Sequence, residues 1–213
     1  MFKEREQEQR FWLWSLFLSS LIGVLFWYFQ RVSVASFSEF FSTTITWISF
    51  FTNITNVLII VMAGSLLFGN GRLHQWFSSP IVQSALCLYI FFVGFTYWLL
   101  LGDPSSIEGL NQWIPEILTH TLSPILGVIY WIRVIPWGHL KWRHSVIWLA
   151  YPITYLVYWL IRGPIVGNYP YFFIDVNTQG YAGVAMWSGA LIVMFVIGGS
   201  IMWGCDRAFA SEA

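Results

Sequence analysis

Residues 50–60 read FFTNITNVLII, a run in which small polar side chains stand at the head of an apolar segment. Thr52, Thr55 and Asn56 are spaced i, i+3 and i+4, so they share one face of a helix. The apolar residues around them extend from 43 to 68, long enough for a helix that crosses a bilayer. Polar side chains at membrane depth are costly, so they usually face a bundle interior or a cavity.

The rest of the chain has the composition of a membrane protein. Of its 213 residues, 57% are hydrophobic and 9% are charged, whereas soluble domains carry roughly a quarter charged residues. A helix needs roughly 20 apolar residues to span a bilayer, and six segments approach this length: 11–29, 43–68, 81–101, 114–135, 145–162 and 182–203. Lipid admits helices or closed barrels, and the alternation of barrel strands is absent. We therefore predict an all-α polytopic membrane protein, a single domain over 1–213 with six transmembrane helices in one bundle.

The basic residues predict the orientation of this bundle. Lys and Arg in short loops stay on the cytoplasmic side. With six crossings, one side holds Lys3, Arg5, Arg10, Arg72, Arg133, Lys141, Arg143 and Arg207. Only Arg31 and Arg162 fall on the other side, so both termini are predicted to be cytoplasmic. The net charge is +0, and no nucleic-acid partner is expected.

A second polar cluster lies in the segment IPEILTHTLSPILGVIYW, residues 114–131. Glu116 precedes His120 by four residues, within reach to bond the imidazole and select its tautomer. Pro124 removes the backbone bond to the carbonyl of His120, which can bend the helix and open room. Thr52, about 13 Å below the outer end of its predicted helix, and His120, about 9 Å below, are expected at similar depth. A buried structural histidine is the alternative interpretation.

A third segment with polar residues among apolar ones is YPITYLVYWLIRGPIVGNYPYFFIDV, residues 151–176. Arg162 ends the predicted fifth helix, where its side chain can snorkel to the headgroups. It can equally pair with Asp175 or Glu116, or hold a carboxylate or phosphate through its planar fork. The loop GNYPYFFIDV is too apolar for a free tether, so we expect it to dip back as a lid over the helix ends.

In the segments FFTNITNVL, HTLSPI, YPITYLVYWLIRG and GNYPYFFIDV, and in their order from about residue 43 to 185, the chain resembles a known family. It is the androgen-induced-gene family of six-helix transmembrane threonine hydrolases, which cleave fatty acid esters of hydroxy fatty acids, together with its bacterial relatives. The resemblance implies an essential Thr and His pair, which match Thr52 and His120 by position. It implies a lipid ester substrate and, from the bacterial relatives, a place in the bacterial inner (plasma) membrane.

The reaction expected of Thr52 and His120 also follows from the chemistry of their side chains, apart from any family resemblance. A hydroxyl becomes a strong nucleophile when a neutral imidazole takes its proton. Thr55 is a rival nucleophile, because TNITN contains a second Thr. Asn53 and Asn56 are candidate donors to the oxyanion, and Glu116 or Asp175 would orient the base. Arg162 would bind a substrate carboxylate beside aromatic walls that include Tyr158. No cofactor or metal is expected; the partners are a fatty acyl ester and membrane lipids.

Three alternative functions, each from a different class of protein, stay open. A small-molecule or lipid transporter or binding protein would use the same polar pocket as a pathway. A metal enzyme would use Glu116, His120 and Asp175 as ligands, a thin set for zinc because only one is a histidine. A structural or assembly role predicts that Thr52 and His120 can be replaced by apolar residues with no consequence beyond stability.

Overall fold

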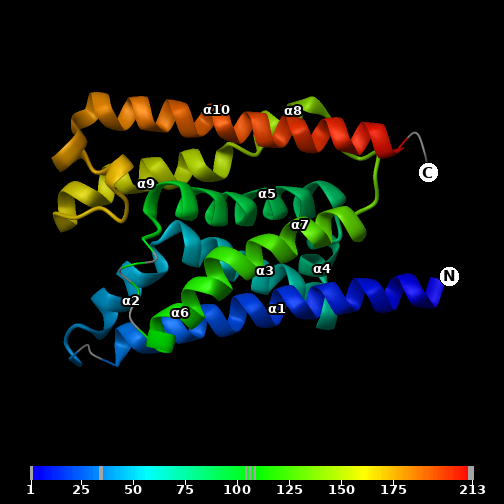
Figure 1. Ribbon diagram of the computed structural model, residues 1–213, viewed down its shortest axis with the longest axis horizontal. Helices are drawn as coiled ribbons and strands as arrows, with labels where there is room; N and C mark the ends of the chain where they lie inside the picture. Colours follow the sequence, from blue (N-terminus) through cyan, green and yellow to red (C-terminus); the bar gives the residue numbers. More distant parts are fainter. Residues whose placement is uncertain (1, 34–35, 104, 106, 108, 211–213) are drawn as a thin grey trace. The chain divides into compact units, whose positions relative to one another are not determined.

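The computed structural model describes residues 2–33, 36–103, 105, 107 and 109–210 (Figure 1). Every regular element in this described part is helical, which confirms the all-α prediction. The chain forms two compact units, one ending at Ile135 and one beginning at Pro136, and each is described by itself. The single domain expected over 1–213 stays a prediction.

The first unit contains the helices that carry Thr52 and His120. Its elements are α1 (Phe2–Val32), α2 (Phe40–Ile48), α3 (Phe51–Phe68), α4 (Arg72–Phe77), α5 (Pro80–Thr96), η1 (Tyr97–Leu101), α6 (Gly109–Ile117), η3 (Leu118–Leu122) and α7 (Ser123–Arg133). Helix α1 packs along α3 and α7, and α5 packs along both α3 and α7 (Figure 1).

The predicted helix 43–68 is divided in two. Helix α2 ends at Ile48, and Phe50 is extended, with φ −73° and ψ 137°, before α3 begins at Phe51. Thr52 therefore lies in the first turn of α3, and not about nine residues inside one long helix as its predicted depth required. The break occurs within an apolar run that contains neither Gly nor Pro, so local sequence gives no signal for it.

The predicted helix 114–135 is also irregular. Its path is helical, but a π turn, η3, separates α6 from α7 and contains His120. A π turn adds a residue to one turn of helix and shifts the faces of the residues around it. Pro124 lies in the first turn of α7, where its missing N–H leaves the carbonyl of His120 without an i+4 donor.

Small hydroxyl side chains join α1 to the π turn. The Ser19 hydroxyl donates to the carbonyl of Leu118 at 3.3 Å, and the Ser20 hydroxyl donates to Ser123 Oγ at 3.1 Å. Ser19 Oγ and Ser123 Oγ are 2.9 Å apart. Small residues let helix backbones approach closely, and in an apolar bundle their hydroxyls are satisfied across the helix interface. These bonds therefore stabilise η3 against α1.

The second unit contains α8 (Trp142–Ile147), α9 (Ala150–Val166), η4 (Phe172–Ile174) and α10 (Val176–Ala210). Helix α10 packs on α8 and η4. The predicted lid loop is packed rather than free: Phe173 and Ile174 are buried, and the Tyr169 ring lies against Gly163, where a Cβ would come within 2.1 Å of it. Its action as a lid over the candidate site stays a prediction.

Five helices of the described chain are long and apolar enough to cross a membrane. They are Glu4–Val32, Phe51–Phe68, Pro80–Leu101, Trp142–Val166 and Val176–Ala210. These helices support the assignment to the membrane-protein class. The segment 114–135 is not among these five helices. The count of six crossings and the cytoplasmic termini stay predictions.

One buried carboxylate holds the second unit together near its basic loop. Asp206 of α10 is 2% exposed, and its Oδ1 and Oδ2 accept the backbone N–H groups of Gly138 and Leu140, each at 2.9 Å. The N–H of His139 donates to Oδ1 at 3.4 Å. Hydrogen bonds to a charged acceptor are stronger than neutral ones, so Asp206 anchors the segment before α8 to the end of α10.

We therefore expect Asp206→Ala to lower the free energy of unfolding by about 3 kcal/mol, because it leaves buried backbone N–H groups without an acceptor. Asp206→Asn, which retains one acceptor oxygen, should lose less. Thermal unfolding in detergent measures both. Equal melting temperatures for wild type and Asp206→Ala would contradict this role.

Candidate active site

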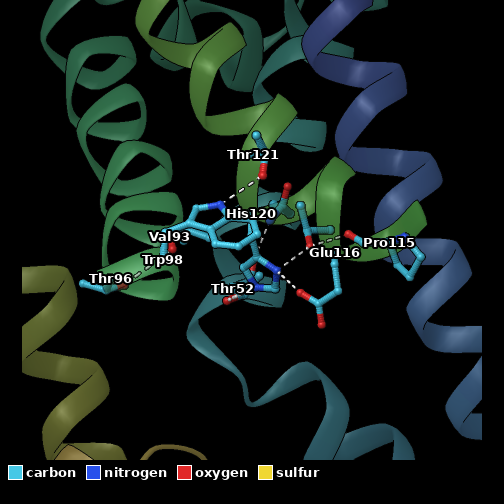
Figure 2. Close-up of polar contacts among 10 residues, drawn as sticks. Thr52, Val93, Thr96, Trp98, Pro115, Glu116, His120 and Thr121 are labelled. Atoms are coloured by element: carbon cyan, nitrogen blue, oxygen red, sulfur yellow. Dashed lines mark hydrogen bonds and ion pairs between the residues drawn. The ribbon is translucent and has the colours of Figure 1, made fainter. Parts of the chain in front are cut away.

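The structure brings Thr52 and His120 together, from α3 and η3 (Figure 2). Thr52 Oγ1 lies 3.3 Å from His120 Nε2. His120 is buried and Thr52 is half-buried. This distance is at the long end for a hydrogen bond, and in unliganded sites such bonds are often long and tighten in the reactive complex. Thr52 therefore presents its hydroxyl to the Nε2 edge of the His120 imidazole.

The other edge of the imidazole faces Glu116 and Thr119. Glu116 Oε2 lies 2.7 Å from His120 Nδ1, as Figure 2 shows. Oε2 makes no directional hydrogen bond among the described residues, so this contact is chiefly electrostatic. The Thr119 hydroxyl donates to the carbonyl of Pro115 at 2.7 Å and lies 3.3 Å from His120 Nδ1.

These contacts assign the tautomer of His120. The Thr119 proton is directed to Pro115, so Thr119 Oγ1 presents a lone pair to Nδ1. A carboxylate and a lone pair both favour a proton on Nδ1. Nε2 is then the unprotonated nitrogen, and it faces the Thr52 hydroxyl as an acceptor. The order Thr52, His120, Glu116 is that of a nucleophile, a base and an orienting acid.

A glycine and a tyrosine complete the surroundings of His120. The Tyr97 ring stacks on the imidazole, with centroids 3.8 Å apart and planes inclined by 9°. Gly94 of α5 lies so close to η3 that a Cβ there would be 2.8 Å from both the His120 carbonyl oxygen and the Pro124 ring. Only a residue without a side chain permits this approach of the two backbones. His120 is thus held from α3, α5, η1 and its own helix.

The remaining polar residues of α3 have structural partners. Thr55 is fully buried, one turn beyond Thr52. Asn53 Nδ2 donates to the carbonyl of Trp47 at 2.7 Å, and Asn56 Nδ2 donates to the carbonyl of Thr52 at 2.9 Å. Asn53 therefore links α3 to α2 across the break, and Asn56 braces the first turn of α3. The amide nitrogens of Asn53 and Asn56 thus both point at backbone carbonyl oxygens rather than at Thr52 Oγ1.

Arg162, Tyr158 and Asp175 belong to the second unit, so the structure does not join them to Thr52 and His120. The Arg162 guanidinium lies 6.0 Å from the ring centroid of Tyr158 and 5.7 Å from that of Trp159, which are cation–π distances. Its Nε is buried without a hydrogen-bond partner among the described residues. Asp175 Oδ1 accepts the N–H of Asn177 at 2.8 Å, so this carboxylate caps the start of α10.

Sequence reasoning missed Tyr97, Thr119, Ser19 and Ser20 around His120. Thr119 adjoins His120 in the chain, but its bond to Pro115 depends on the π turn. Tyr97 is one of ten tyrosines in the chain, and nothing local sets it apart. The two serines resemble the small residues of any membrane helix. Only their three-dimensional neighbours distinguish them.

An apolar groove of about 550 Å³ adjoins the site between α5 with η1 and η3 with α7. Its volume falls within the range of ligand pockets, about 300–1,000 Å³. The groove is walled by aromatic and aliphatic side chains and reaches His120 and Thr121. Its walls include Phe95, Trp98 and Ile125. The first unit therefore offers apolar surface next to its polar centre.

Comparison with protein-family models, with curated proteins and with solved structures finds no match to this chain. The resemblance to the six-helix threonine hydrolases is therefore an expectation drawn from its short segments. Within the described residues, no group of three or more His, Cys, Asp and Glu side chains is placed to hold a metal ion.

The close approach at Gly94 yields a prediction. Gly94→Ala forces α5 away from η3, and overpacking of this kind costs about 1–3 kcal/mol. We expect a lower melting temperature and a displaced His120. Gly204→Ala is the matched control, since nothing lies within 4 Å of the Cβ it adds to α10. Equal melting temperatures for the two variants would contradict the close packing.

Proposed function

We propose that this protein is an integral membrane hydrolase that cleaves ester bonds of fatty acyl lipids. The observation that carries the proposal is the chain of contacts from Thr52 Oγ1 to His120 Nε2 and from His120 Nδ1 to Glu116. Its apolar surroundings favour a lipid substrate. The family resemblance supplies the substrate class, fatty acid esters of hydroxy fatty acids, and the bacterial inner membrane as its location.

In the proposed reaction Thr52 Oγ1 attacks the ester carbonyl carbon while His120 Nε2 takes the hydroxyl proton. The tetrahedral intermediate collapses, and His120 returns the proton to the departing alcohol oxygen. Thr52 is left as an acyl ester. Water then attacks this ester, with His120 again as base, and releases the fatty acid and the free hydroxyl. Glu116 stabilises the imidazolium that forms in both halves.

The position of Thr52 in the first turn of α3 supports this chemistry. The N-terminal end of a helix carries a partial positive charge of about half a unit, which stabilises negative charge nearby. Negative charge develops on the substrate oxygen when Thr52 attacks, and helix N-termini serve this purpose in many sites. This end of α3 exists because the chain is extended at Phe50. The break between α2 and α3 is thus part of the proposed mechanism.

A binding or transport protein would use the same pocket without bond cleavage, and labelling distinguishes the two. An alkyl fluorophosphonate should modify wild-type protein at Thr52 in detergent. We expect no labelling of Thr52→Ala and a loss of about 10²-fold or more for His120→Ala, the range of general-base contributions. Thr52→Ser should retain labelling.

Thr55→Ala is the matched comparison, because it removes the rival hydroxyl one turn away. It should keep the label if the folded fraction, measured by thermal unfolding, is unchanged. Label on Thr55, or none on folded wild type, would overturn the assignment of Thr52.

The role of Glu116 is tested by Glu116→Gln, which keeps the shape of the side chain and removes its charge. Loss of the charge that stabilises the imidazolium should slow labelling about tenfold or more. Glu39→Gln, at an exposed carboxylate bonded to Ser36, should leave the rate unchanged. A Glu116→Gln protein that labels at the wild-type rate would remove Glu116 from the mechanism.

A further inference from the structure

Two π turns meet at His120. One is η1 (Tyr97–Leu101), which continues α5, and the other is η3 (Leu118–Leu122). They are joined by the stack of Tyr97 on His120 and by a hydrogen bond of 3.0 Å from Trp98 Nε1 to Thr121 Oγ1. Figure 2 shows the second bond. π turns account for well under 1% of residues and are frequent at functional sites, so a contact between two of them calls for an explanation.

The stack contacts the part of His120 that its hydrogen bonds leave open. Nε2 and Nδ1 lie on the ring edge, where they face Thr52 and the pair Thr119 and Glu116. These contacts restrain the positions of the two ring nitrogens. They leave the ring free to tilt about the line that joins those nitrogens. Tyr97 lies parallel to one face of the imidazole at 3.8 Å, the distance of direct contact. It therefore limits rotation of the ring away from Thr52.

Tyr97 also reaches the third member of the candidate site. Its phenol group lies near enough to the Glu116 carboxylate for an electrostatic interaction between the two side chains. The dipole of a nearby phenol O–H helps to offset the cost of holding a carboxylate charge in an apolar bundle. One side chain thus contacts the imidazole with its ring and brings its hydroxyl near the carboxylate.

We infer that Tyr97 is a positioning residue for the reaction at Thr52: its ring holds the His120 imidazole toward the threonine hydroxyl. This inference rests on the proposed function. When His120 takes the Thr52 proton it becomes a cation, and a cation over an aromatic face is attracted to it. The attraction is absent while the imidazole is neutral, so it favours the transition state over the ground state. Such contacts correspond to about two- to thirtyfold in rate.

The test compares Tyr97→Phe, which keeps the ring and loses the hydroxyl, with Tyr97→Leu, which loses both. The rate of fluorophosphonate labelling is measured against probe concentration, so that the maximal rate constant is separated from the half-saturating concentration. We expect Tyr97→Leu to lower the maximal rate constant about tenfold or more, with the half-saturating concentration unchanged. Tyr97→Phe, which keeps the stacked ring, should stay close to wild type. Tyr181→Leu removes an exposed tyrosine of α10 and should match wild type.

A second measurement tests positioning without catalysis. Diethyl pyrocarbonate modifies accessible neutral imidazoles, and mass spectrometry reports the extent at His120. Loss of the covering ring should raise this modification several-fold in Tyr97→Leu and little in Tyr97→Phe, with thermal unfolding as the check on folding.

The outcomes separate the two claims. Unlabelled wild type would overturn the proposed function, and the pyrocarbonate result would still decide the role of Tyr97. Labelled wild type with an unaffected, folded Tyr97→Leu would overturn only the inference, as would equal pyrocarbonate modification of wild type and Tyr97→Leu.

Discussion

The structure of the first unit depends on one constraint: an imidazole buried among apolar helices must have both ring nitrogens satisfied. An unpaired buried polar group costs several kcal/mol, about as much as a small domain can spare. His120 meets this requirement with Thr52 at one nitrogen and with Glu116 and Thr119 at the other. Glu116 and Thr119 come from its own helix. Thr52 comes from a different helix, α3. The start of α3 at Phe51 places the Thr52 hydroxyl beside Nε2.

The constraint explains why the helices around His120 are irregular. The extended residue Phe50 places Thr52 in the first turn of α3, and two π turns place Tyr97 and His120 face to face. Each irregularity interrupts the regular backbone ladder, which is costly in an apolar environment. Nearby contacts offset that cost: the hydroxyl of Ser19 accompanies the π turn, and Gly94 allows α5 to lie against it. Arrangements of this kind persist where the surrounding structure holds them in place.

The candidate nucleophile and base are complete within one unit of the chain. The charged residues of the second unit are accommodated locally: Asp175 caps α10, Asp206 anchors the segment before α8, and Arg162 lies over aromatic rings. The proton transfer proposed for Thr52 and His120 thus involves side chains of the first unit alone.

The sequence by itself determined the helical class, the membrane-spanning lengths of five segments and the pairing of Glu116 with His120. Each of these depends on composition or on neighbours one helical turn apart, which a sequence displays directly. It also placed Thr52 and His120 in one candidate site, through spacing and resemblance. It did not reveal the break before α3 or the two π turns, because no Gly or Pro marks the first and tertiary contacts stabilise the others. Only the tertiary structure decided that Thr52 rather than Thr55 faces Nε2, and that Tyr97 covers the ring, since such contacts join residues far apart in the chain.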